Sequence, residues 1–347
     1  MQRHRARHAA PEMIRIALFG AGRIGAVHAD NIASLHPRAQ LACVYDINEA
    51  AATALAARHG ASAAASVAGV LGDPGIDAVL IASSTATHVE LITAAARAGK
   101  AILCEKPIDL DIARVERCRA AIAGSGVPIQ LGFNRRYDRS HRALRDAVRA
   151  GEVGALELLA ITSRDPGLPP VAYLKDSGGI FRDMTIHDFD LASFILGNDP
   201  IIELYATGSV MVDQALREFD DIDTAMVVMK AASGALVHIN NSRRAVYGYD
   251  QRVEAFGASG MVQSGNHVAS SLLRFNAQTT EAREPLLHFF IERYLQAYRD
   301  ELTEFVEVVE SGRQPTAGFE DGRRALLLAD AAWESLRSGR KVTLRYD

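Results

Sequence analysis

The stretch Ile14–Gly25, IRIALFGAGRIG, decides the fold of the first third of the chain. It begins with a short apolar run and ends in the pattern GxGxxG, whose glycines are Gly20, Gly22 and Gly25. Glycines at this spacing let the backbone turn tightly, approach a pyrophosphate and pack a helix against a strand. Helix-forming residues follow through about Leu35, and N–H groups at a helix N-terminus bind phosphate. The sequence therefore predicts a strand, a dinucleotide-binding loop and a helix.

A second apolar run, Leu41 to Tyr45, ends at Asp46, which lies 21 residues after Gly25. A carboxylate at about this distance from the glycine pattern is expected to accept hydrogen bonds from a ribose 2′-hydroxyl. The same carboxylate repels a 2′-phosphate, so NAD is favoured over NADP, although Arg23 in the glycine loop would attract that phosphate. The alternative is a chance glycine turn followed by an ordinary surface aspartate.

Strands and helices continue to alternate after Asp46, as the βαβ units of a parallel sheet require. The predicted elements are a helix at Glu49–His59, a strand at Ala78–Ile81, a helix at Thr87–Ala98, a strand at Ala101–Leu103, a helix at Asp111–Ala123 and a strand at Pro128–Leu131. They predict an α/β domain over residues 13–132 with a doubly wound parallel sheet, the Rossmann arrangement.

Two polar loops follow strands of this sheet, and loops at the carboxyl ends of parallel strands face the bound ligand. The first carries Ser83, Thr85 and His88, which we expect beside the cofactor, although His88 would also suit a helix cap. The second is Glu105–Pro107, whose Lys106 can donate to a substrate hydroxyl and favour its deprotonation. The alternative for Lys106 is a surface lysine paired with the glutamate before it.

After Gly132 the chain changes to strands without helices between them. After a helix that ends at about Ala150, the predicted strands are Leu156–Ser163, Ile201–Ser209, Thr224–Lys230, Ala235–Ser242 and Arg252–Gly257. Ala231–Gly234 joins two of them as a hairpin turn. Two further helices are predicted at Pro285–Glu310 and Phe319–Ser338. Residues 133–347 are therefore predicted to form an α+β domain with a large, mainly antiparallel sheet.

The stretch Ser177–Asp190, SGGIFRDMTIHDFD, carries the candidate chemistry of this second domain. The apolar residues over Met184–Leu196 predict a helix that is buried on nearly every side. Asp183, His187 and Asp190 interrupt that pattern at i, i+4 and i+7 and would share one face. An Asp one turn before a His can orient the imidazole and stabilise its charged form, as a general base at neutral pH requires. The alternative is a core histidine bonded to its neighbouring aspartates.

Composition limits the classes of partner. The 347 residues carry a net charge of −4 with scattered basic residues, so neither nucleic acid nor an anionic membrane surface is predicted. No apolar run approaches the roughly 20 residues of a membrane-spanning helix. Residues 1–12 are polar, lack the apolar core of a signal peptide and are expected to be a poorly ordered extension. Three irregularly spaced cysteines predict no disulfide framework and fit a reducing cytoplasm.

With these motifs, the chain resembles the glucose-fructose oxidoreductase and inositol dehydrogenase family over nearly everything after residue 12. The motifs that carry the resemblance are the glycine loop, Thr87-His88, Glu105-Lys106-Pro107 and the D-x-x-x-H pair of Asp183 and His187. Within the family, GFNRRYD at Gly132–Asp138 and the stretch Ser177–Asp190 resemble inositol 2-dehydrogenases. Ser163 departs from this pattern, because some inositol enzymes carry a substrate-contacting His at its position.

The resemblance implies NAD as cofactor and a neutral cyclic polyol as substrate, with the axial hydroxyl of myo-inositol oxidised to the 2-ketone. The residues implied to contact the cofactor are Gly20, Gly22, Arg23, Ile24, Gly25, Asp46, Ser83, Thr85, His88, Glu105, Lys106 and Pro107. His187 is implied to remove the hydroxyl proton, and Lys106 to donate a hydrogen bond to the developing alkoxide. The family's sheet-to-sheet assembly implies a homotetramer.

The residues implied to hold the substrate are Asp183, Asn134, Arg135 and Tyr247. Arg135 would also suit a structural role, and Tyr249 is as suitable as Tyr247. Asp183 would either hold a substrate hydroxyl or orient the histidine.

Three alternatives remain: another inositol isomer or a sugar as substrate, a zinc hydrolase, and a non-catalytic cofactor-dependent sensor. A zinc site would use Asp183, His187 and Asp190, but such sites usually have further His or Cys ligands, so no metal is predicted. A sensor would be expected to lack Lys106 or His187, and the chain has both.

Overall fold

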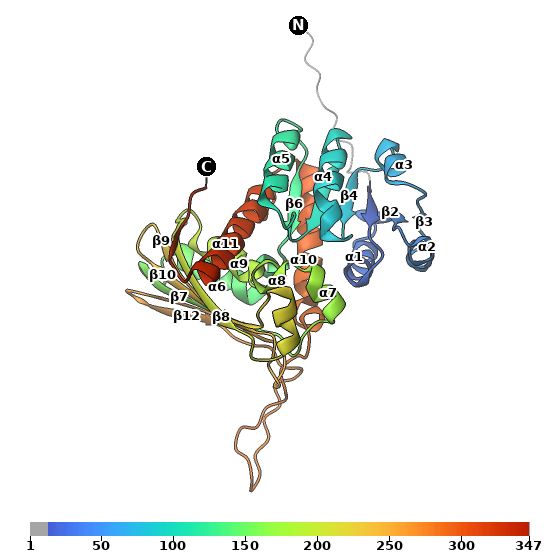
Figure 1. Cartoon of the computed structure of the whole chain (residues 1–347). Helices are drawn as coiled ribbons and strands as arrows, with labels where there is room; N and C mark the ends of the chain where they lie inside the picture. The colour runs from blue at the N-terminus through green and yellow to red at the C-terminus, as the bar shows by residue number, and fades with distance from the viewer. Residues whose placement is uncertain (1–12, 347) are drawn as a thin grey trace. The chain divides into compact units, whose positions relative to one another are not determined.

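The computed structural model describes residues 13–346, and the chain divides into two compact units (Figure 1). The first unit contains the residues up to Gly132 together with Tyr298–Gly322. The second contains Phe133–Ala297 and the residues from Arg323 onward. The sequence placed every residue from 133 in the second domain, so the assignment of Tyr298–Gly322 to the first unit is a difference. The extension expected at residues 1–12 lies outside the described residues.

The first unit contains a six-stranded sheet in which every neighbouring pair is parallel. The spatial order is β3 (Ser62–Ala63), β2 (Ala39–Tyr45), β1 (Ile14–Phe19), β4 (Ala78–Ile81), β5 (Ala101–Glu105) and β6 (Ile129–Gly132). The helices between the strands are α1 (Arg23–Ser34), α2 (Glu49–Arg58), α3 (Val67–Gly72), α4 (His88–Arg97) and α5 (Ile112–Ile122). The strand order reverses between β1 and β4, where sheets of this kind bind dinucleotides. The predicted doubly wound parallel sheet is confirmed.

Helix α10 (Phe290–Ser311) explains why Tyr298–Gly322 belongs to the first unit. Its residues Leu302, Phe305 and Val306 are fully buried in the same apolar core as the strands of the parallel sheet. Burying a side chain of this size stabilises a fold by about 1.5–3 kcal/mol. The apolar face of α10 could be predicted from the sequence, but which sheet it covers could not.

The second unit contains a seven-stranded sheet that is mainly antiparallel. The spatial order is β12 (Gly260–Ser264), β11 (Asp250–Gly257), β7 (Leu156–Arg164), β10 (Leu236–Ser242), β9 (Thr224–Ala231), β8 (Ile201–Ser209) and β13 (Val342–Thr343). The pair β7 and β10 is parallel, and every other neighbouring pair is antiparallel. The predicted hairpin turn joins β9 to β10, and Gly234 supplies a positive φ of 100° there. The predicted α+β domain is confirmed.

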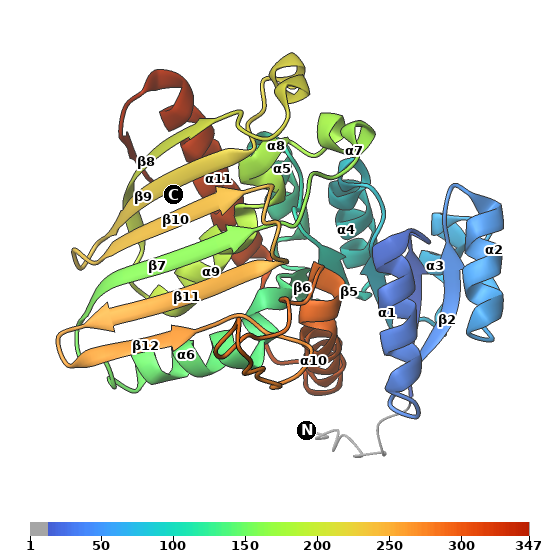
Figure 2. The same cartoon turned by 90° about the horizontal axis from the view of Figure 1, so that it is seen from below.

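One face of this sheet is covered by α6 (Arg139–Arg149), α9 (Ile186–Leu196) and α11 (Phe319–Ser338), which lie behind the strands in Figure 2. The helices and strands share one buried apolar core. Along β9, Val227 and Met229 are buried in that core, whereas Met226 and Val228 are exposed. The alternation shows that the unit's own helices leave the other face of the sheet uncovered.

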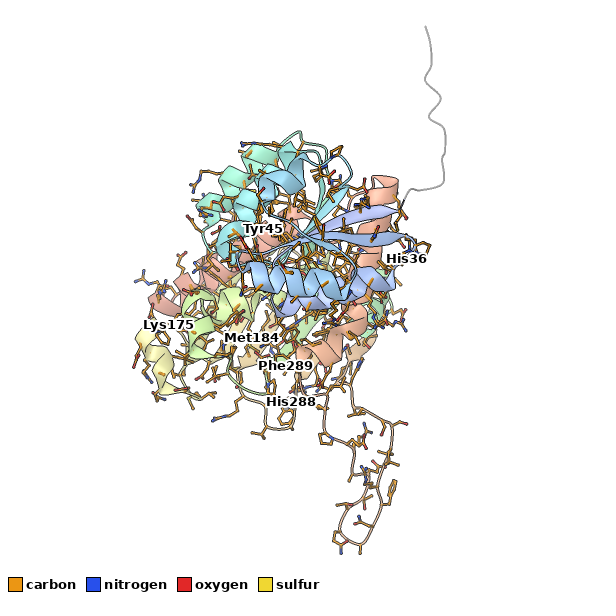
Figure 3. All side chains as sticks on the ribbon, turned by 90° about the vertical axis from the view of Figure 1, so that its right-hand side faces the viewer. His36, Tyr45, Lys175, Met184, His288 and Phe289 are labelled. Atoms are coloured by element: carbon orange, nitrogen blue, oxygen red, sulfur yellow. The ribbon has the colours of Figure 1, made fainter. Side chains whose placement is uncertain are left out.

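Shorter elements complete the second unit. They are α7 (Val171–Asp176), α8 (Gly179–Asp183) and 3₁₀ turns at Asn134–Tyr137 and Gln214–Phe219. In the first unit, one more 3₁₀ turn, Thr85–Thr87, precedes α4. Residues 265–289 form a long excursion that ends at His288 and Phe289 (Figure 3). The backbone of Leu287 is bonded to His267 and Tyr249, so α10 begins at Phe290 and not at the predicted Pro285. Within residues 13–346, no helix combines the length and the hydropathy needed to cross a membrane.

Candidate active site

Two close contacts that exclude side chains shape the glycine loop between β1 and α1. Gly20 has a φ of +107°, and a Cβ there would lie 2.5 Å from the carbonyl carbon and oxygen of Ala82. A Cβ on Gly25 would lie 2.1 Å from the carbonyl oxygen of Gly20. Both distances are far below van der Waals contact, so the loop needs glycine at both positions to bring α1 against β1.

Gly22 differs, because no atom lies within 4 Å of the place its Cβ would take. It is the N-cap of α1, and no side chain caps that helix end. Open space in front of a helix N-terminus suits a phosphate, which backbone N–H groups bind there. The loop therefore fits the pyrophosphate of NAD, with Arg23 and Ile24 in the first turn of α1.

Asp46 lies just after β2, and two backbone N–H groups orient its carboxylate. Oδ2 accepts a hydrogen bond from the N–H of Ala21 at 2.7 Å, and Oδ1 accepts one from the N–H of Asn48 at 2.8 Å. The bond to Ala21 attaches the carboxylate directly to the glycine loop. Each oxygen keeps further acceptor capacity, so the hydroxyls of a ribose can still donate to it. Arg23 on the same loop is exposed.

His88 joins the loops that follow β4 and β5. Its Nδ1 lies 2.8 Å from the carbonyl oxygen of Pro107, and its Nε2 lies 3.1 Å from the carbonyl oxygen of Ser83. The ring is buried, and burial lowers the pKa of His88. The neutral ring donates to one of these two carbonyl oxygens and contacts the other, so His88 links the two loops, and its place beside the cofactor stays a prediction. Ser83 and Thr85 are partly exposed on the first of these loops.

Lys106 follows β5 directly and is partly buried. Both of its neighbours in the chain are held by histidines of the first unit. Glu105 Oε1 lies 2.8 Å from Nε2 of His28 on α1, and the carbonyl of Pro107 contacts His88. The backbone that carries Lys106 is therefore fixed on both sides.

In the second unit, Asp183 and His187 lie on different helices. α8 ends at Asp183 and α9 begins three residues later, because the N–H of Thr185 bonds to the carbonyl of Ile180 at 2.9 Å. A bond to the fifth residue back closes a helix C-terminus. The predicted arrangement of Asp183 and His187 on one continuous helix is therefore interrupted at Met184 and Thr185. Eight residues of α9 are buried, so the prediction of a buried helix over Met184–Leu196 is confirmed from its third residue onward.

Asp183 is held by two side chains from other parts of the second unit. Its Oδ1 accepts a hydrogen bond from the hydroxyl of Tyr173 at 2.6 Å, and its Oδ2 accepts one from Nη2 of Arg243 at 3.0 Å. Burial and then the neighbouring carboxylate raise the pKa of Tyr173, so its hydroxyl stays a donor. Arg243 is only 1% exposed and supplies a fixed positive charge. Sequence reasoning selected neither of these partners.

His187 is partly exposed, whereas the other residues of α9 from Ile186 to Ala192 are buried. Its ring meets the ring of Phe133 edge-on, with centroids 6.2 Å apart. Asp190, which was predicted to share a face with His187, is buried in a two-point ion pair with Arg136 at 2.6 and 2.8 Å. The alternative zinc site therefore loses one of its three expected ligands, because the carboxylate of Asp190 is already bonded to a guanidinium.

Arg135 lies in a buried network around Asp188. Its Nη1 donates to Asp188 Oδ1 at 2.5 Å and to the hydroxyl of Ser163 at 2.9 Å. Asp188 also accepts hydrogen bonds from Ser163 at 2.5 Å and from Nδ2 of Asn241 at 2.8 Å. These four residues are at most 3% exposed, which favours the structural alternative for Arg135. No sequence signal singled out Asp188, since it is one more polar residue on an apolar helix.

Asp165 follows β7 and lies close enough to the Asp183–Arg243 pair to be influenced by both. Burial raises the pKa of Asp165 to about 6, with Arg243 opposing the rise and Asp183 adding to it. A carboxyl group that titrates near neutrality beside Asp183 is a candidate for contact with a substrate hydroxyl. Its position at a strand end, two residues after Ser163, is the signal that could have found it.

Tyr247 and Tyr249 differ in exposure. Tyr247 is 46% exposed, and its hydroxyl donates to Asp250 Oδ2 at 2.7 Å. Tyr249 is 6% exposed, and its hydroxyl accepts a hydrogen bond from Arg135 at 3.4 Å, so it belongs to the buried network. Asn134 is 2% exposed. Tyr247 is therefore the most accessible of the predicted polyol contacts outside α8 and α9.

Comparison with protein families matches both units. Residues 14–133 match the oxidoreductase family with an NAD-binding Rossmann fold, and residues 141–263 match the GFO/IDH/MocA C-terminal domain. The chain is 44% identical over 331 residues to the inositol 2-dehydrogenase of Rhizobium meliloti. This match covers 95% of this chain and 99% of that protein.

Solved structures agree with these matches. A myo-inositol dehydrogenase from Corynebacterium glutamicum is 46% identical with a TM-score of 0.92, covering 96% of this chain and 99% of that one. The scyllo-inositol dehydrogenase of Lactobacillus casei with bound NAD(H) and scyllo-inositol is 28% identical with a TM-score of 0.86, covering 95% and 99%. The chain belongs to the GFO/IDH/MocA oxidoreductase family, with an NAD-binding Rossmann domain at residues 14–133.

Proposed function

We propose that this protein is an NAD-dependent inositol 2-dehydrogenase, which oxidises the axial hydroxyl of myo-inositol to the 2-ketone. The proposal rests on similarity to proteins named inositol dehydrogenases over about the whole chain, at 43–46% identity. A shared fold alone does not assign a reaction, so the site residues must also suit it. The glycine loop fits a pyrophosphate, and His187 is a partly exposed base on a buried helix.

The oxidation breaks the C–H and O–H bonds of one ring position and forms a carbonyl, so a hydride and a proton must both be accepted. When bound, NAD supplies the acceptor for the hydride. We assign the proton to a ring nitrogen of His187, which acts as general base. His187 returns this proton to solvent through its exposed side.

Lys106 is proposed to donate a hydrogen bond from its ammonium group to the oxygen that becomes negative as the proton leaves. Donors aimed at a developing charge lower the barrier most when they are held in place beforehand. The contacts of Glu105 and Pro107 with His28 and His88 hold the backbone of Lys106 in this way.

Asp183 is proposed to accept a hydrogen bond from a neighbouring substrate hydroxyl while Tyr173 and Arg243 fix its carboxylate. Asn134 and Tyr247 remain proposed polyol contacts, and Asp165 is added to them. For Arg135 we now propose an indirect role, because its guanidinium is committed to the carboxylate of Asp188.

A polyol panel tests the function. NADH formation would be followed by absorbance with myo-, scyllo- and chiro-inositol and with glucose, each with and without a chelator. The proposal expects myo-inositol to give the highest kcat/KM and the chelator to have no effect. A preferred sugar would support the alternative substrate class, and no reduction of NAD with any polyol would support a cofactor-dependent sensor.

We further propose a cytoplasmic homotetramer that assembles through the uncovered face of the second unit's sheet. The apolar side chains on that face, each between 41% and 56% exposed, are Leu158, Tyr205, Met226, Val228, Leu236, Phe256 and Met261. Strand register places Leu158 beside both Leu236 and Phe256, so the patch is continuous across strands. Continuous exposed apolar patches mark protein interfaces. Three buried free thiols fit a reducing compartment.

Light scattering after gel filtration tests the assembly. The wild type should elute with the mass of four chains, and Val228→Lys should elute as a smaller species. Met211→Lys is the control, because Met211 is 62% exposed but lies outside the strands of the sheet. If Val228→Lys keeps the wild-type mass, this face is not the interface.

A further inference from the structure

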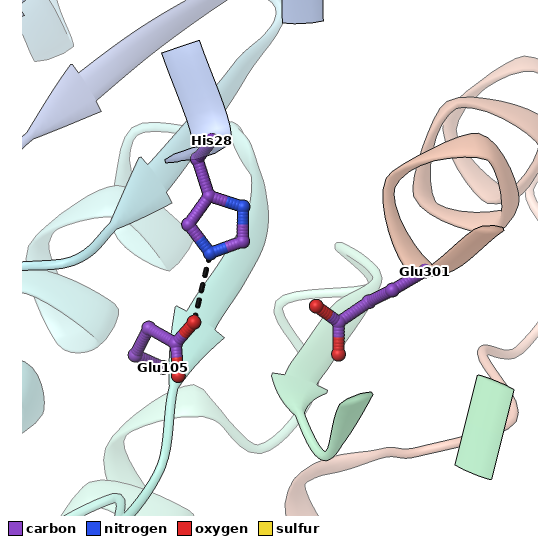
Figure 4. Close-up of side chains that lie close together, drawn as sticks. All are labelled: His28, Glu105 and Glu301. Carbon is purple, nitrogen blue, oxygen red and sulfur yellow. Dashed lines mark hydrogen bonds and ion pairs between the residues drawn. The ribbon is translucent and has the colours of Figure 1, made fainter. Parts of the chain in front are cut away.

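Three ionisable side chains of the first unit meet in its interior. His28 lies on α1, Glu105 is the last residue of β5 and Glu301 lies on α10. Figure 4 shows the carboxylate of Glu301 facing the hydrogen-bonded pair of His28 and Glu105. One ligand atom from each side chain lies within 4.8 Å of the others. We name these residues the His28 triad.

The triad contains buried polar atoms whose bonding is incomplete. His28 and Glu301 are fully buried, and the Glu105 side chain is 13% exposed. Within residues 13–346, no hydrogen-bond partner contacts either carboxylate oxygen of Glu301 or Nδ1 of His28. The amide of Gln130 donates to the backbone carbonyl of Glu301 and leaves the carboxyl group itself unbonded.

An ionised Glu301 would be expensive in these surroundings. Burying an unpaired carboxylate costs several kcal/mol, and two neighbouring carboxylates in one buried site do not both ionise. Burial, then Glu105 and then Glu304 raise the pKa of Glu301 well above its usual range. Glu304 is on the same helix, and its carboxylate is already bonded to Arg313 and Thr316. Within residues 13–346, the groups that face Glu301 in this cluster are two acids, Glu105 and Glu304, and the imidazole of His28.

We propose that the His28 triad shares a proton held on Glu301, which donates to the second oxygen of Glu105 and so fixes the Glu105–Pro107 turn that carries Lys106. Glu301 is then a positioning residue for Lys106, and this consequence rests on the role proposed for Lys106. His28 holds one oxygen of Glu105, the neutral acid of Glu301 holds the other, and the three residues tie α1, β5 and α10 together.

A bound metal ion is the competing occupant of this cluster. Zinc ligands lie about 2.0–2.2 Å from the metal, so the atoms of a tetrahedral site are about 3.3 Å apart. His28 Nε2 and Glu105 Oε1 are 2.8 Å apart and directly bonded, so a metal would have to separate them. A proton on Glu301 leaves the bond between His28 and Glu105 intact and removes the cost of a second buried charge beside Glu105.

The proposal has a consequence at high pH. Loss of the proton from Glu301 would place a second negative charge beside Glu105, with Glu304 as the further acid on the same helix, and would release the turn that carries Lys106. kcat should then fall at high pH in the wild type. Glu301→Gln keeps a neutral donor of the same shape, so its kcat should not show this fall.

Infrared spectroscopy and kinetics together test the triad. The wild type at pH 7 should show the carbonyl band of a protonated carboxylic acid, which shifts in D₂O and is absent from Glu301→Gln. Glu304→Gln is the matched control and should keep the band. Glu301→Leu, which removes the donor, should lower kcat at least about tenfold, since a misplacement of ~1 Å can cost about 10²-fold. Glu301→Gln should stay within about threefold of wild type.

Four results would overturn the proposal: no protonated-acid band in the wild type, a band unchanged in Glu301→Gln, stoichiometric zinc binding that His28→Ala abolishes, or a Glu301→Gln enzyme as impaired as Glu301→Leu. The last of these results would show that a charge, and not a donor, is needed. The infrared and zinc measurements use no polyol, so they stand even if the proposed substrate fails. If Glu301→Leu does not fold, the spectra of the wild type and of Glu301→Gln still decide.

Discussion

The glycine loop of the first unit and the surroundings of His187 in the second unit are ordered in different ways. In the loop, close backbone contacts set the structure, because neighbouring backbone atoms leave no room for a Cβ at Gly20 or Gly25, which lie within six consecutive residues. Around His187, order comes from buried side-chain pairs such as Arg135 with Asp188, which are 53 residues apart in the chain. Substitutions in the loop should therefore change cofactor affinity, whereas substitutions around His187 should change either turnover or stability.

The largest expected effect separates turnover from stability on the His187 side. His187→Ala should lower kcat by about 10²–10⁴-fold, the usual cost of losing a general base. Its side chain is partly exposed on an otherwise buried stretch of α9, so the free energy of unfolding and the affinity for NAD should stay close to wild type. Steady-state kinetics and titration of NAD by fluorescence measure both.

His36→Ala is the control for this substitution, because His36 is an exposed histidine just after α1, outside the α8 and α9 stretch, and should tolerate the change. If His187→Ala retains most of its turnover, the assignment of the general base fails. If it loses NAD affinity in parallel with kcat, the contrast between the two regions fails too.

The next effect should appear in stability. Asp188→Ala leaves the guanidinium of Arg135 buried without its carboxylate, and breaking a buried ion pair in this way costs about 3–5 kcal/mol. Urea denaturation should show this loss, while Asp176→Ala, at an exposed position, should be nearly neutral. A loss below about 1 kcal/mol would place Asp188 among weak surface pairs and would contradict its role in the network.

This contrast also explains which features the sequence could predict. The Rossmann sheet depends on local patterns, namely apolar strands, GxGxxG and Asp46 at the expected distance. Each of these patterns is visible in the sequence, so the sheet could be predicted from it. The break between Asp183 and α9 was not, because it depends on one backbone bond from Thr185. The partners of Asp183 and Asp188 come from strands and loops whose register no single sequence specifies.

The same limit applies to α10 and to the His28 triad. The periodicity of Phe290–Ser311 predicts an amphipathic helix but not the sheet that it covers. Glu301 therefore looks like one of several surface acids of that helix in the sequence, although it is fully buried. His28 likewise looks like an ordinary helical residue until β5 brings Glu105 to it.

A smaller effect should come from acid, again on the second unit. His141 is buried, with Ser264 at 3.0 Å from one ring nitrogen and Tyr294 at 3.4 Å from the other. Burial lowers the pKa of His141 far below its ordinary value. Asp138 opposes this shift, whereas the positive charges of Arg293, Arg135 and His267 add to it. In the unfolded chain His141 binds a proton near pH 6.5, whereas in the folded chain it stays neutral at that pH. Stability is therefore fully present above that pH and is lost as pH falls, by about 2 kcal/mol between pH 7 and pH 5.

Urea denaturation at pH 7 and pH 5 measures this loss, and His141→Gln should remove most of the pH dependence while lowering stability somewhat at pH 7. Other buried acids and bases titrate in both proteins, so the difference between the two proteins isolates His141. Equal pH dependence in the wild type and in His141→Gln would show that this histidine does not carry the effect.

The smallest expected effect concerns coenzyme choice at the glycine loop, where Asp46 and Arg23 act in opposite directions. The carboxylate of Asp46 gains hydrogen bonds from the ribose of NAD, and bonds to a charged group contribute about 1.5–3 kcal/mol each. Arg23 is exposed, so its attraction to a 2′-phosphate should be worth about 1 kcal/mol or less. NAD should therefore be preferred over NADP by at least about tenfold in kcat/KM, since about 1.4 kcal/mol is a factor of ten.

Two substitutions separate the charge of Asp46 from its contacts with Ala21 and Asn48. Asp46→Asn removes the charge but keeps one acceptor oxygen for the loop, whereas Asp46→Ser shortens the side chain and loses those contacts as well. Both should shrink or reverse the preference by relieving repulsion of the 2′-phosphate, and Asp46→Ser should also weaken NAD binding more. Comparing kcat/KM for both coenzymes in the three proteins measures this. Equal use of NAD and NADP by the wild type would refute this account of Asp46, because the exposed Arg23 would then offset a carboxylate that the backbone holds in place.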